Sequence, residues 1–181
     1  MNKHATHVSS SSAAPPGARQ RVLAVGSGGG HLAQLLALRP WWQDHDRSWV
    51  CFDGPDARDQ LAGERVVWAY SPTTRSVINL VRNFFLALRV MRRESPDVVV
   101  STGAGVAVPF FVVARLLGIA TVYVEVIDRV SSRTMTGRLV RPISSAFCVQ
   151  WPEQADLYPG SVVVGPLLEW ESPPVAGDSL R

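Results

Sequence analysis

The chain has 181 residues, of which 46% are hydrophobic and 18% are charged, and this balance excludes a protein that is disordered along its whole length. Eighteen Lys and Arg residues against fifteen Asp and Glu residues give a formal net charge of +3, which does not by itself indicate a nucleic-acid-binding protein. Cys51 and Cys148 lie far apart in apolar runs, so they predict neither a disulfide framework nor a metal site. We expect no metal and no cofactor.

The N-terminal residues 1–20 are predicted to be a disordered tail, because they are rich in Ser and Pro and contain no apolar segment. No uncharged apolar run reaches the roughly 18 residues that a transmembrane helix needs. The best candidate, 104–124, is interrupted by Pro109 and Arg115. We therefore expect a chain that does not span a membrane, although it can rest on a membrane surface.

Apolar, strand-like runs alternate with helical patterns through the rest of the chain. The seven runs are residues 21–25, 49–52, 66–70, 98–101, 121–125, 146–150 and 162–164. Continuous Val-rich runs are typical of strands covered on both faces, as in a parallel sheet with helical crossovers. The predicted fold is a single Rossmann-like α/β domain over residues 21–170, with a doubly wound parallel sheet and a C-terminal tail at 171–181.

A glycine-rich loop, Gly26–Gly30, follows the first predicted strand and leads to His31 at the start of a helix. Glycines such as Gly28, Gly29 and Gly30 let a ligand approach the backbone, and the free N–H groups of a helix N-terminus attract an anion. A histidine at this place can donate a hydrogen bond or act as a base. A tight turn without a ligand is the alternative.

A second loop, Ser101–Gly105, repeats the strand, glycine loop and helix pattern after the fourth strand. Ligands of open α/β sheets bind in the crevice at the carboxyl ends of the strands. Two glycine loops converging there predict a phosphate-bearing ligand, bound by Ser101, Gly103 and Gly105 together with the first loop. A closely packed turn is the alternative.

A third polar group, Glu125–Arg129, follows the fifth strand. Its two carboxylates, Glu125 and Asp128, and the guanidinium of Arg129 emerge where a parallel strand ends. They predict a contact to a sugar hydroxyl or to a partner chain, with a buried ion pair or a helix cap as the alternative. Arg129 is the cation of this group that we expect to contact the ligand.

The segment 76–93 predicts a basic amphipathic helix. On a helical wheel, one face is polar and basic and consists of Arg75, Asn79, Arg82, Asn83, Arg89 and Arg93. The opposite face is apolar and consists of Val77, Leu80, Val81, Phe84, Leu88 and Met91. Such a helix packs on the core or lies on a membrane. The membrane-facing residues would be Arg82, Phe85, Leu86 and Arg89. A second cluster without an acid follows at Arg129, Arg133, Arg138 and Arg141.

Taken in order, these motifs resemble a known family. They are the segments 26–32, 99–105, 124–130 and 149–153, followed by Tyr158-Pro159-Gly160 and Val164-Gly165-Pro166. The chain is similar to the acceptor-side subunit of split, two-chain UDP-sugar glycosyltransferases. Members include the membrane-anchoring subunit of the dolichol-pathway N-acetylglucosaminyltransferase and bacterial capsule and exopolysaccharide subunits.

The resemblance implies the N-terminal half of a GT-B glycosyltransferase, active with a partner chain that binds the UDP-sugar. This half would bind a lipid-diphosphate-linked saccharide and associate with a membrane surface, with no nucleic acid involved. Gly28, Gly29, Gly30, Gly103 and Gly105 would line the acceptor diphosphate. Glu125 and Arg129 would face the cleft between the subunits, where Ser101 and Arg129 would also help to bind the acceptor.

The reaction implied is an inverting sugar transfer, for which His31 and Glu125 are the candidate bases. Eukaryotic members carry an N-terminal membrane helix, whereas this tail shows none, so attachment would fall to segment 76–93 or to the substrate. We expect a cytoplasmic protein, peripheral on the inner face of a bacterial plasma membrane.

Two other functions remain open from the sequence. A Rossmann domain that binds a dinucleotide would use Asp53 on a ribose, although His31 stands where its fingerprint needs a glycine. A non-catalytic scaffold would recruit and stabilise the transferase partner at the membrane.

Overall fold

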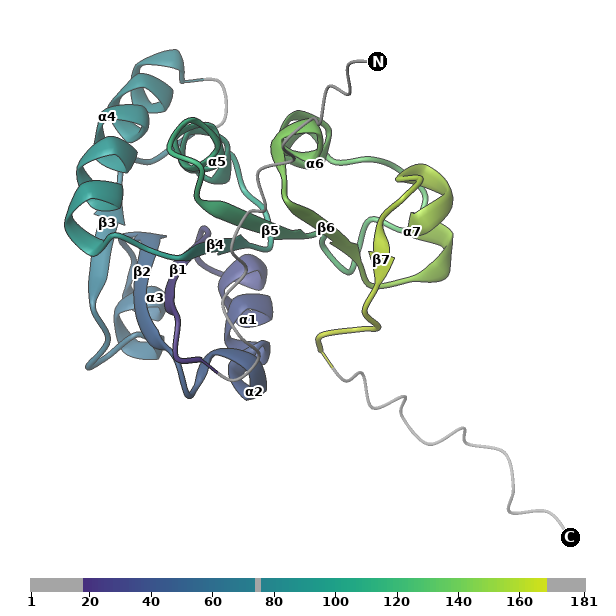
Figure 1. The fold of residues 1–181 in the computed structure, drawn as a ribbon, viewed down its shortest axis with the longest axis horizontal. Coiled ribbons are helices and arrows are strands. Elements are labelled where there is room, and N and C mark those ends of the chain that lie inside the picture. Colours follow the sequence, from purple (N-terminus) through teal and green to yellow (C-terminus); the bar gives the residue numbers. More distant parts are fainter. Residues whose placement is uncertain (1–17, 74–75, 169–181) are drawn as a thin grey trace, which may run out of the picture.

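The computed structural model describes residues 18–73 and 76–168, which form a seven-stranded, fully parallel sheet (Figure 1). The strand order is β3-β2-β1-β4-β5-β6-β7. The strands are β1 (Arg21–Val25), β2 (Asp46–Phe52), β3 (Val66–Ala69), β4 (Val98–Ser101), β5 (Ala120–Val124), β6 (Ala146–Val149) and β7 (Val162–Val163). The predicted doubly wound parallel sheet is confirmed.

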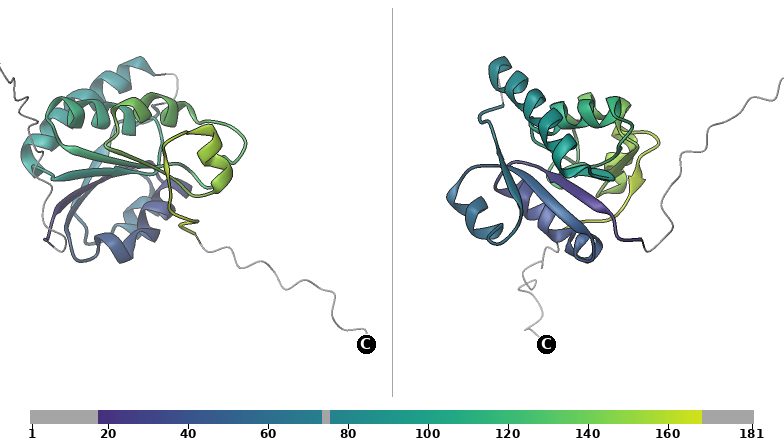
Figure 2. Two further views of the ribbon diagram at one scale, coloured as in Figure 1. Left: turned by 45° about the vertical axis from the view of Figure 1, so that its right-hand side comes forward. Right: turned by 60° about the vertical axis from the view of Figure 1, so that its left-hand side comes forward.

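Helices cover both faces of the sheet (Figure 2). They are α1 (Gly30–Ala37), α2 (Arg39–Trp42), α3 (Pro55–Gln60), α4 (Val77–Glu94), α5 (Ala107–Leu116), α6 (Met135–Val140), the 3₁₀ turn η1 (Arg141–Ile143) and α7 (Pro152–Leu157). α1, α2 and α3 lie on one face and α4, α5 and α6 on the other, while α7 lies beside the β7 edge (Figures 1 and 2).

Each face of the sheet has its own hydrophobic cluster, which explains the Val-rich strands. Leu23 and Val99 pack under α4 and α5, whereas the neighbouring Val22 and Val98 pack on the side of α1. Side chains of a strand alternate between faces, so a strand buried on both sides must be apolar at successive positions. Tyr123 stacks on Phe147 at a centroid distance of 5.0 Å and extends the first cluster across β5 and β6.

The strand boundaries differ from the predicted ones by a few residues. β2 begins at Asp46 rather than at residue 49, because the whole of β1 pairs with it, starting with Arg21 opposite Asp46. Glu125 and Gln150 lie just beyond the ends of β5 and β6. Residues 1–17 and 171–181 of the predicted tails, and Arg75 of the predicted helical wheel, lie outside the described residues.

The helix predicted over 76–93 is α4, and its buried face matches the predicted apolar face only in part. Met91 is buried and Phe84 and Leu88 pack against the core, whereas Val77, Leu80 and Val81 are exposed. Asn83, placed on the polar face by the wheel, is fully buried and packs on the core side together with Ala87, Val90 and Met91. Its side-chain amide donates to the carbonyl of Tyr70 and accepts from the N–H of Tyr70, both at 2.9 Å. The prediction was wrong here because a buried asparagine is stable when both ends of its amide are paired.

The outer face of α4 carries apolar and basic side chains together. Ile78 and Phe85 are 68% and 64% exposed, and Val77 and Val81, predicted on the apolar face, are also exposed. Arg82 stands four residues after Ile78, and Arg89 stands four residues after Phe85, so by helical periodicity these four side chains share one face of α4. This surface is called the α4 outer face below. Within residues 18–73 and 76–168, no helix has the length and apolar character needed to cross a membrane.

Replacing the fully buried Asn83 by Ala leaves the Tyr70 N–H and C=O without their side-chain partners on the inner side of α4. We expect the free energy of unfolding to fall by about 2–3 kcal/mol, the usual cost of unpaired buried polar groups. Urea denaturation measures this change. Asn79→Ala, which removes an exposed bond to the Pro72 carbonyl, is the matched control; equal effects of the two substitutions would contradict the assignment.

Candidate functional site at the carboxyl edge of the sheet

The three predicted loops follow β1, β4 and β5, which are neighbours in the sheet. Because all strands are parallel, their carboxyl ends meet at one edge and bring the loops together there. The chain leaves β1 toward β2 on one side and returns to β4 on the other, so the edge between β1 and β4 is the topological switch point. Open α/β sheets bind ligands at this place.

The first loop presents open backbone to the solvent. Gly29 is the N-cap of α1 with a φ of 67°, a conformation that favours glycine. A Cβ added at Gly28, Gly29 or Gly30 would meet no atom of another part of the chain within 4 Å. The first N–H groups of α1 have no partners within the helix, so this loop can accept an anion.

His31 joins the first loop to the second. Its Nδ1 lies 2.9 Å from the Thr102 carbonyl oxygen, and the Thr102 hydroxyl donates to the His31 carbonyl at 2.7 Å. A carbonyl only accepts, so Nδ1 carries the proton in this bond and Nε2 keeps a lone pair in the neutral ring. The backbone bond thus orients the imidazole with a free basic nitrogen.

Gly103 is required by this contact. Its φ of 123° is unfavourable for other residues, and a Cβ there would lie 2.7 Å from His31 Cε1. Beside the joined loops lies a shallow pocket of about 410 Å³ that includes His31 and Gly105. Its other lining residues are Ser27, Phe52, Ser71, Pro72, Thr73 and Ala104.

Ser101 does not reach this pocket. It is fully buried, and its hydroxyl accepts from the Gly103 N–H at 3.0 Å and donates to the Gly103 carbonyl at 3.2 Å. The prediction that Ser101 binds the acceptor is corrected: its hydroxyl shapes the second loop from inside. Gly103 and Gly105 remain at the edge itself.

Glu125 is also fully buried, which contradicts the expectation that it faces a cleft. Its carboxylate accepts from the Thr134 hydroxyl at 3.0 Å, from the Tyr158 hydroxyl at 2.5 Å and from the Val126 N–H at 3.0 Å. Burial and the neighbouring Glu125 raise the pKa of Tyr158 to about 12, which keeps its hydroxyl proton available for this bond. We name this arrangement the Glu125–Thr134–Tyr158 lock.

Side chains that sequence patterns did not single out hold the loop after β5. The buried Gln34 accepts from the Ile127 N–H at 3.2 Å and from Gln150 Nε2 at 2.6 Å. The Gln154 amide donates to the Val126 carbonyl at 2.7 Å, and Trp151 Nε1 donates to the Ile127 carbonyl at 2.9 Å. Gln150 and Trp151 of the family motif at 149–153, together with Gln34 and Gln154, therefore hold the chain that leads to Arg129.

Arg129 itself is exposed at this edge, and so is Asp128.

Asp53, the candidate ribose ligand, is paired with Arg58 at 2.5 Å, and this guanidinium lowers the pKa of the Asp53 carboxyl. The acid that a dinucleotide site needs is thus already engaged with a cation. Among the residues that the structure describes, no group of three or more His, Cys, Asp or Glu side chains is arranged to hold a metal ion.

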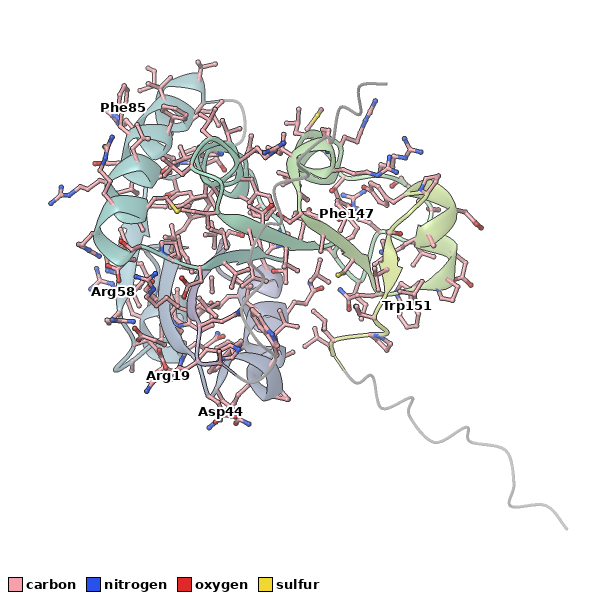
Figure 3. The ribbon with its side chains drawn as sticks, viewed as in Figure 1. Arg19, Asp44, Arg58, Phe85, Phe147 and Trp151 are labelled. Carbon is pink, nitrogen blue, oxygen red and sulfur yellow. The ribbon has the colours of Figure 1, made fainter. Side chains whose placement is uncertain are left out.

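The predicted membrane-facing residues divide into two sets. Arg82, Phe85 and Arg89 are exposed on the α4 outer face, and Figure 3 shows Phe85 pointing away from the sheet. Leu86 is partly buried and packs against the core cluster, so its predicted membrane contact is corrected.

Replacing Glu125 by Gln places an amide N–H₂ against two hydroxyl donors in a closed site. We expect the free energy of unfolding to fall by about 2 kcal/mol or more, because at least one buried polar group loses its partner. Urea unfolding of Glu125→Gln against the exposed Glu153→Gln measures this difference. An unchanged midpoint for Glu125→Gln would show that the lock does not stabilise the fold.

This chain was compared with known protein families, curated proteins and solved structures. A family model described as "Oligosaccharide biosynthesis protein Alg14 like" matches residues 65–167. The human UDP-N-acetylglucosamine transferase subunit ALG14 is 38% identical over 96 residues, which cover 50% of this chain and 44% of the human protein. The protein of the same name from Eremothecium gossypii is 36% identical over 93 residues, 46% of this chain and 42% of its own. The chain thus spans less than half the length of these relatives.

Solved structures support the fold. MurG from Acinetobacter baumannii superposes with a TM-score of 0.62 at 21% identity over 74% of this chain and 42% of MurG. The calicheamicin glycosyltransferase CalG4 gives 0.55 at 16% identity over 82% of this chain and 53% of CalG4. The fold of this chain is therefore similar to about half of each of these two proteins.

The two ALG14 relatives are eukaryotic, and the description of the matching family refers to oligosaccharide biosynthesis. They give no support to the predicted bacterial source or to a role in capsule or exopolysaccharide synthesis. A family model that covers residues 65–167 and relatives at this identity agree on one assignment. The chain belongs to the Alg14 family of oligosaccharide biosynthesis proteins.

Proposed function

We propose that this chain is the acceptor-binding subunit of a two-chain glycosyltransferase. The enzyme transfers a sugar from a UDP-sugar to a lipid-diphosphate-linked saccharide. The observation that carries the proposal is the pair of glycine loops joined by His31 and Thr102 at the switch point of the sheet. The relatives' name, UDP-N-acetylglucosamine transferase subunit, supports N-acetylglucosamine as the sugar and supports a partner chain that binds the donor.

The acceptor diphosphate has a suitable place on the first loop. The open backbone at Gly28, Gly29 and Gly30 and the free N–H groups of α1 match the charge and the size of phosphate oxygens. Gly103 and Gly105 bring the second loop to the same edge, and the exposed Arg129 adds a cation. With the diphosphate on the first loop, we propose that the saccharide lies near the pocket that contains His31.

The chemical step is an inverting displacement. A hydroxyl of the acceptor sugar attacks the anomeric carbon, a new glycosidic C–O bond forms, and the bond from that carbon to the diphosphate of UDP breaks. UDP takes the electron pair of the broken bond, and the hydroxyl proton passes to His31 Nε2. Glu125 is excluded from this role by its burial in the lock, so His31 is the base that we propose.

Membrane association is proposed for the α4 outer face. Exposed apolar side chains beside arginines are typical of helices that lie in a membrane interface, where the arginines contact anionic lipid headgroups. Ile78 and Phe85 supply the apolar part, and Arg82 and Arg89 the basic part. The protein would then be peripheral on the cytoplasmic face of a membrane that carries its lipid-linked acceptor.

The non-catalytic scaffold remains the second candidate, favoured by the relatives' description as a subunit. It differs from the proposal in one measurable way, since substitution of His31 would then leave the turnover rate unchanged. The dinucleotide-binding domain is less well supported, because Asp53 is paired with Arg58.

The catalytic proposal predicts that His31→Ala lowers the turnover of the reconstituted two-chain enzyme by about 100-fold or more, the usual contribution of a general base. His31→Asn should be equally slow, although its amide N–H₂ can still donate to the Thr102 carbonyl. A rate near that of the unsubstituted enzyme for the Asn variant would assign His31 a structural role only. His45→Ala, at the amino-terminal side of β2, is the control.

The membrane proposal predicts that Arg82→Glu combined with Arg89→Glu weakens binding to anionic vesicles. Each arginine near such a surface contributes about 1 kcal/mol, so the pair should lower the affinity at least about 30-fold. Sedimentation with vesicles measures the bound fraction. Arg19→Glu with Arg39→Glu makes the same change of charge on exposed residues away from α4, and equal losses for both pairs would refute a specific role of this helix.

A further inference from the structure

A second group of arginines surrounds a pocket at α6 and η1, lined by residues other than those of the glycine loops. The pocket, of about 400 Å³, is lined by Arg133, Arg138, Arg141, Pro142 and Tyr158. The ion pairs of the described residues involve Arg21, Arg47, Arg58, Arg65 and Arg93. Within residues 18–73 and 76–168, the three arginines of the pocket therefore have no carboxylate partner, which leaves a concentrated positive charge. We call this site the α6 arginine pocket.

The backbone that carries these arginines is fixed by the Glu125–Thr134–Tyr158 lock. Thr134 caps α6 by accepting from the Gly137 N–H at 2.9 Å, and its own N–H donates to the Tyr158 hydroxyl at 3.1 Å. A Cβ at Gly137 would collide with a carboxylate oxygen of Glu125, so the helix lies close against the lock. The start of α6 is thus held from the core side.

Two of the three guanidinium groups are oriented by the protein itself. Arg133 lies over the ring of Tyr158, with its Cζ 5.6 Å from the ring centroid. Arg141 donates from Nη2 to the Pro159 carbonyl. Arg138 and Arg141 are three residues apart and therefore share one flank of the helical turn. Two of the pocket's three cations, Arg133 and Arg141, are therefore held in place by contacts within the protein.

We propose that the α6 arginine pocket binds a phosphate group. Planar guanidinium forks match phosphate oxygens with two parallel N–H···O bonds, which makes arginine clusters selective for this chemistry. A phosphate can come from a lipid headgroup or from a soluble ligand that carries a diphosphate. The phosphate site depends on the proposed membrane association only where the phosphate belongs to a lipid, and it is independent of the sugar transfer.

Two observations favour a lipid headgroup as the source. Met135 and Leu139, four residues apart on α6, are 71% and 52% exposed beside the pocket. α6 also lies in the same helix layer as α4 (Figure 2). A headgroup in the pocket would therefore leave its acyl chains near exposed apolar side chains of the same layer.

NMR titration of the side-chain Nε–Hε signals of Arg138 and Arg141 tests the proposal. Each signal is assigned because it is missing from the spectrum of the single variant Arg138→Gln or Arg141→Gln. The probes are inorganic pyrophosphate and the short-chain soluble lipid dihexanoyl phosphatidic acid. We expect saturable shifts of these two signals in the unsubstituted chain. Arg138→Gln with Arg141→Gln should lower the affinity of the preferred probe about 25-fold, from about fivefold per arginine.

Arg19→Gln with Arg39→Gln removes the same charge elsewhere and should leave the affinity unchanged. Arg138→Lys with Arg141→Lys keeps the charge but loses the fork, so an intermediate affinity supports paired hydrogen bonding. Tighter binding of the lipid than of pyrophosphate assigns the phosphate to a headgroup, and the reverse assigns it to a soluble ligand.

Absence of saturable shifts with both probes overturns the proposal, as does an unchanged affinity in the folded double Gln variant. The shifts in the unsubstituted chain decide the matter even if the double variant does not fold. Turnover of the double variant with a soluble acceptor separates this site from the proposed function. The phosphate site can fail while the His31 variants remain inactive, and the His31 assignment can fail while the pocket still binds phosphate.

Discussion

The hydrogen bonds exchanged between His31 and Thr102 are the constraint on which the candidate site depends. They connect two loops that lie 71 positions apart in the sequence and meet at the point where the sheet reverses its winding. One of these bonds selects the imidazole tautomer, and the close contact with Gly103 leaves no room for a side chain there. The hydrogen bonds between His31 and Thr102 therefore set both the approach of the two loops and the position of the imidazole proton.

Buried polar side chains replace apolar packing around the carboxyl ends of β5 and β6. Gln34, Gln150, Gln154 and Glu125 are all nearly or fully inaccessible, yet each is hydrogen bonded. A polar interior of this kind is stable only when its groups are paired, and pairing restricts it to one arrangement. The backbone that leads to Arg129 is thus held by side-chain hydrogen bonds, although it has no regular secondary structure.

Much of the fold could be predicted from the sequence, because the signals for it are local. Val-rich runs such as 98–101 are strands in the structure as predicted, and the glycine loop at 26–30 precedes a helix. Burial was misjudged where a partner distant in the sequence decides it. Asn83 looks like a solvent-facing residue on a helical wheel, but the Tyr70 backbone pairs with its amide.

The same limit applies to the site residues. Glu125 follows a strand as a catalytic carboxylate would, but Tyr158 and Thr134, brought near only by the folded chain, occupy its oxygens. Ser101 stands in a glycine loop as a ligand-binding serine would, although its hydroxyl turns inward to Gly103. No spacing rule reveals that Gln34 and Gln150 touch, since 116 positions separate them.

The amide of Gln150 has a mechanical consequence. Its nitrogen donates to Gln34 Oε1 and to the Glu125 carbonyl, while its oxygen accepts from the Leu167 N–H just beyond β7. A force that displaces the chain at Leu167 must rotate this rigid, planar group or break one of its bonds. Tension on the segment after β7 would therefore pass through the Gln150 amide to the Glu125 carbonyl, at the start of the loop that bears Arg129.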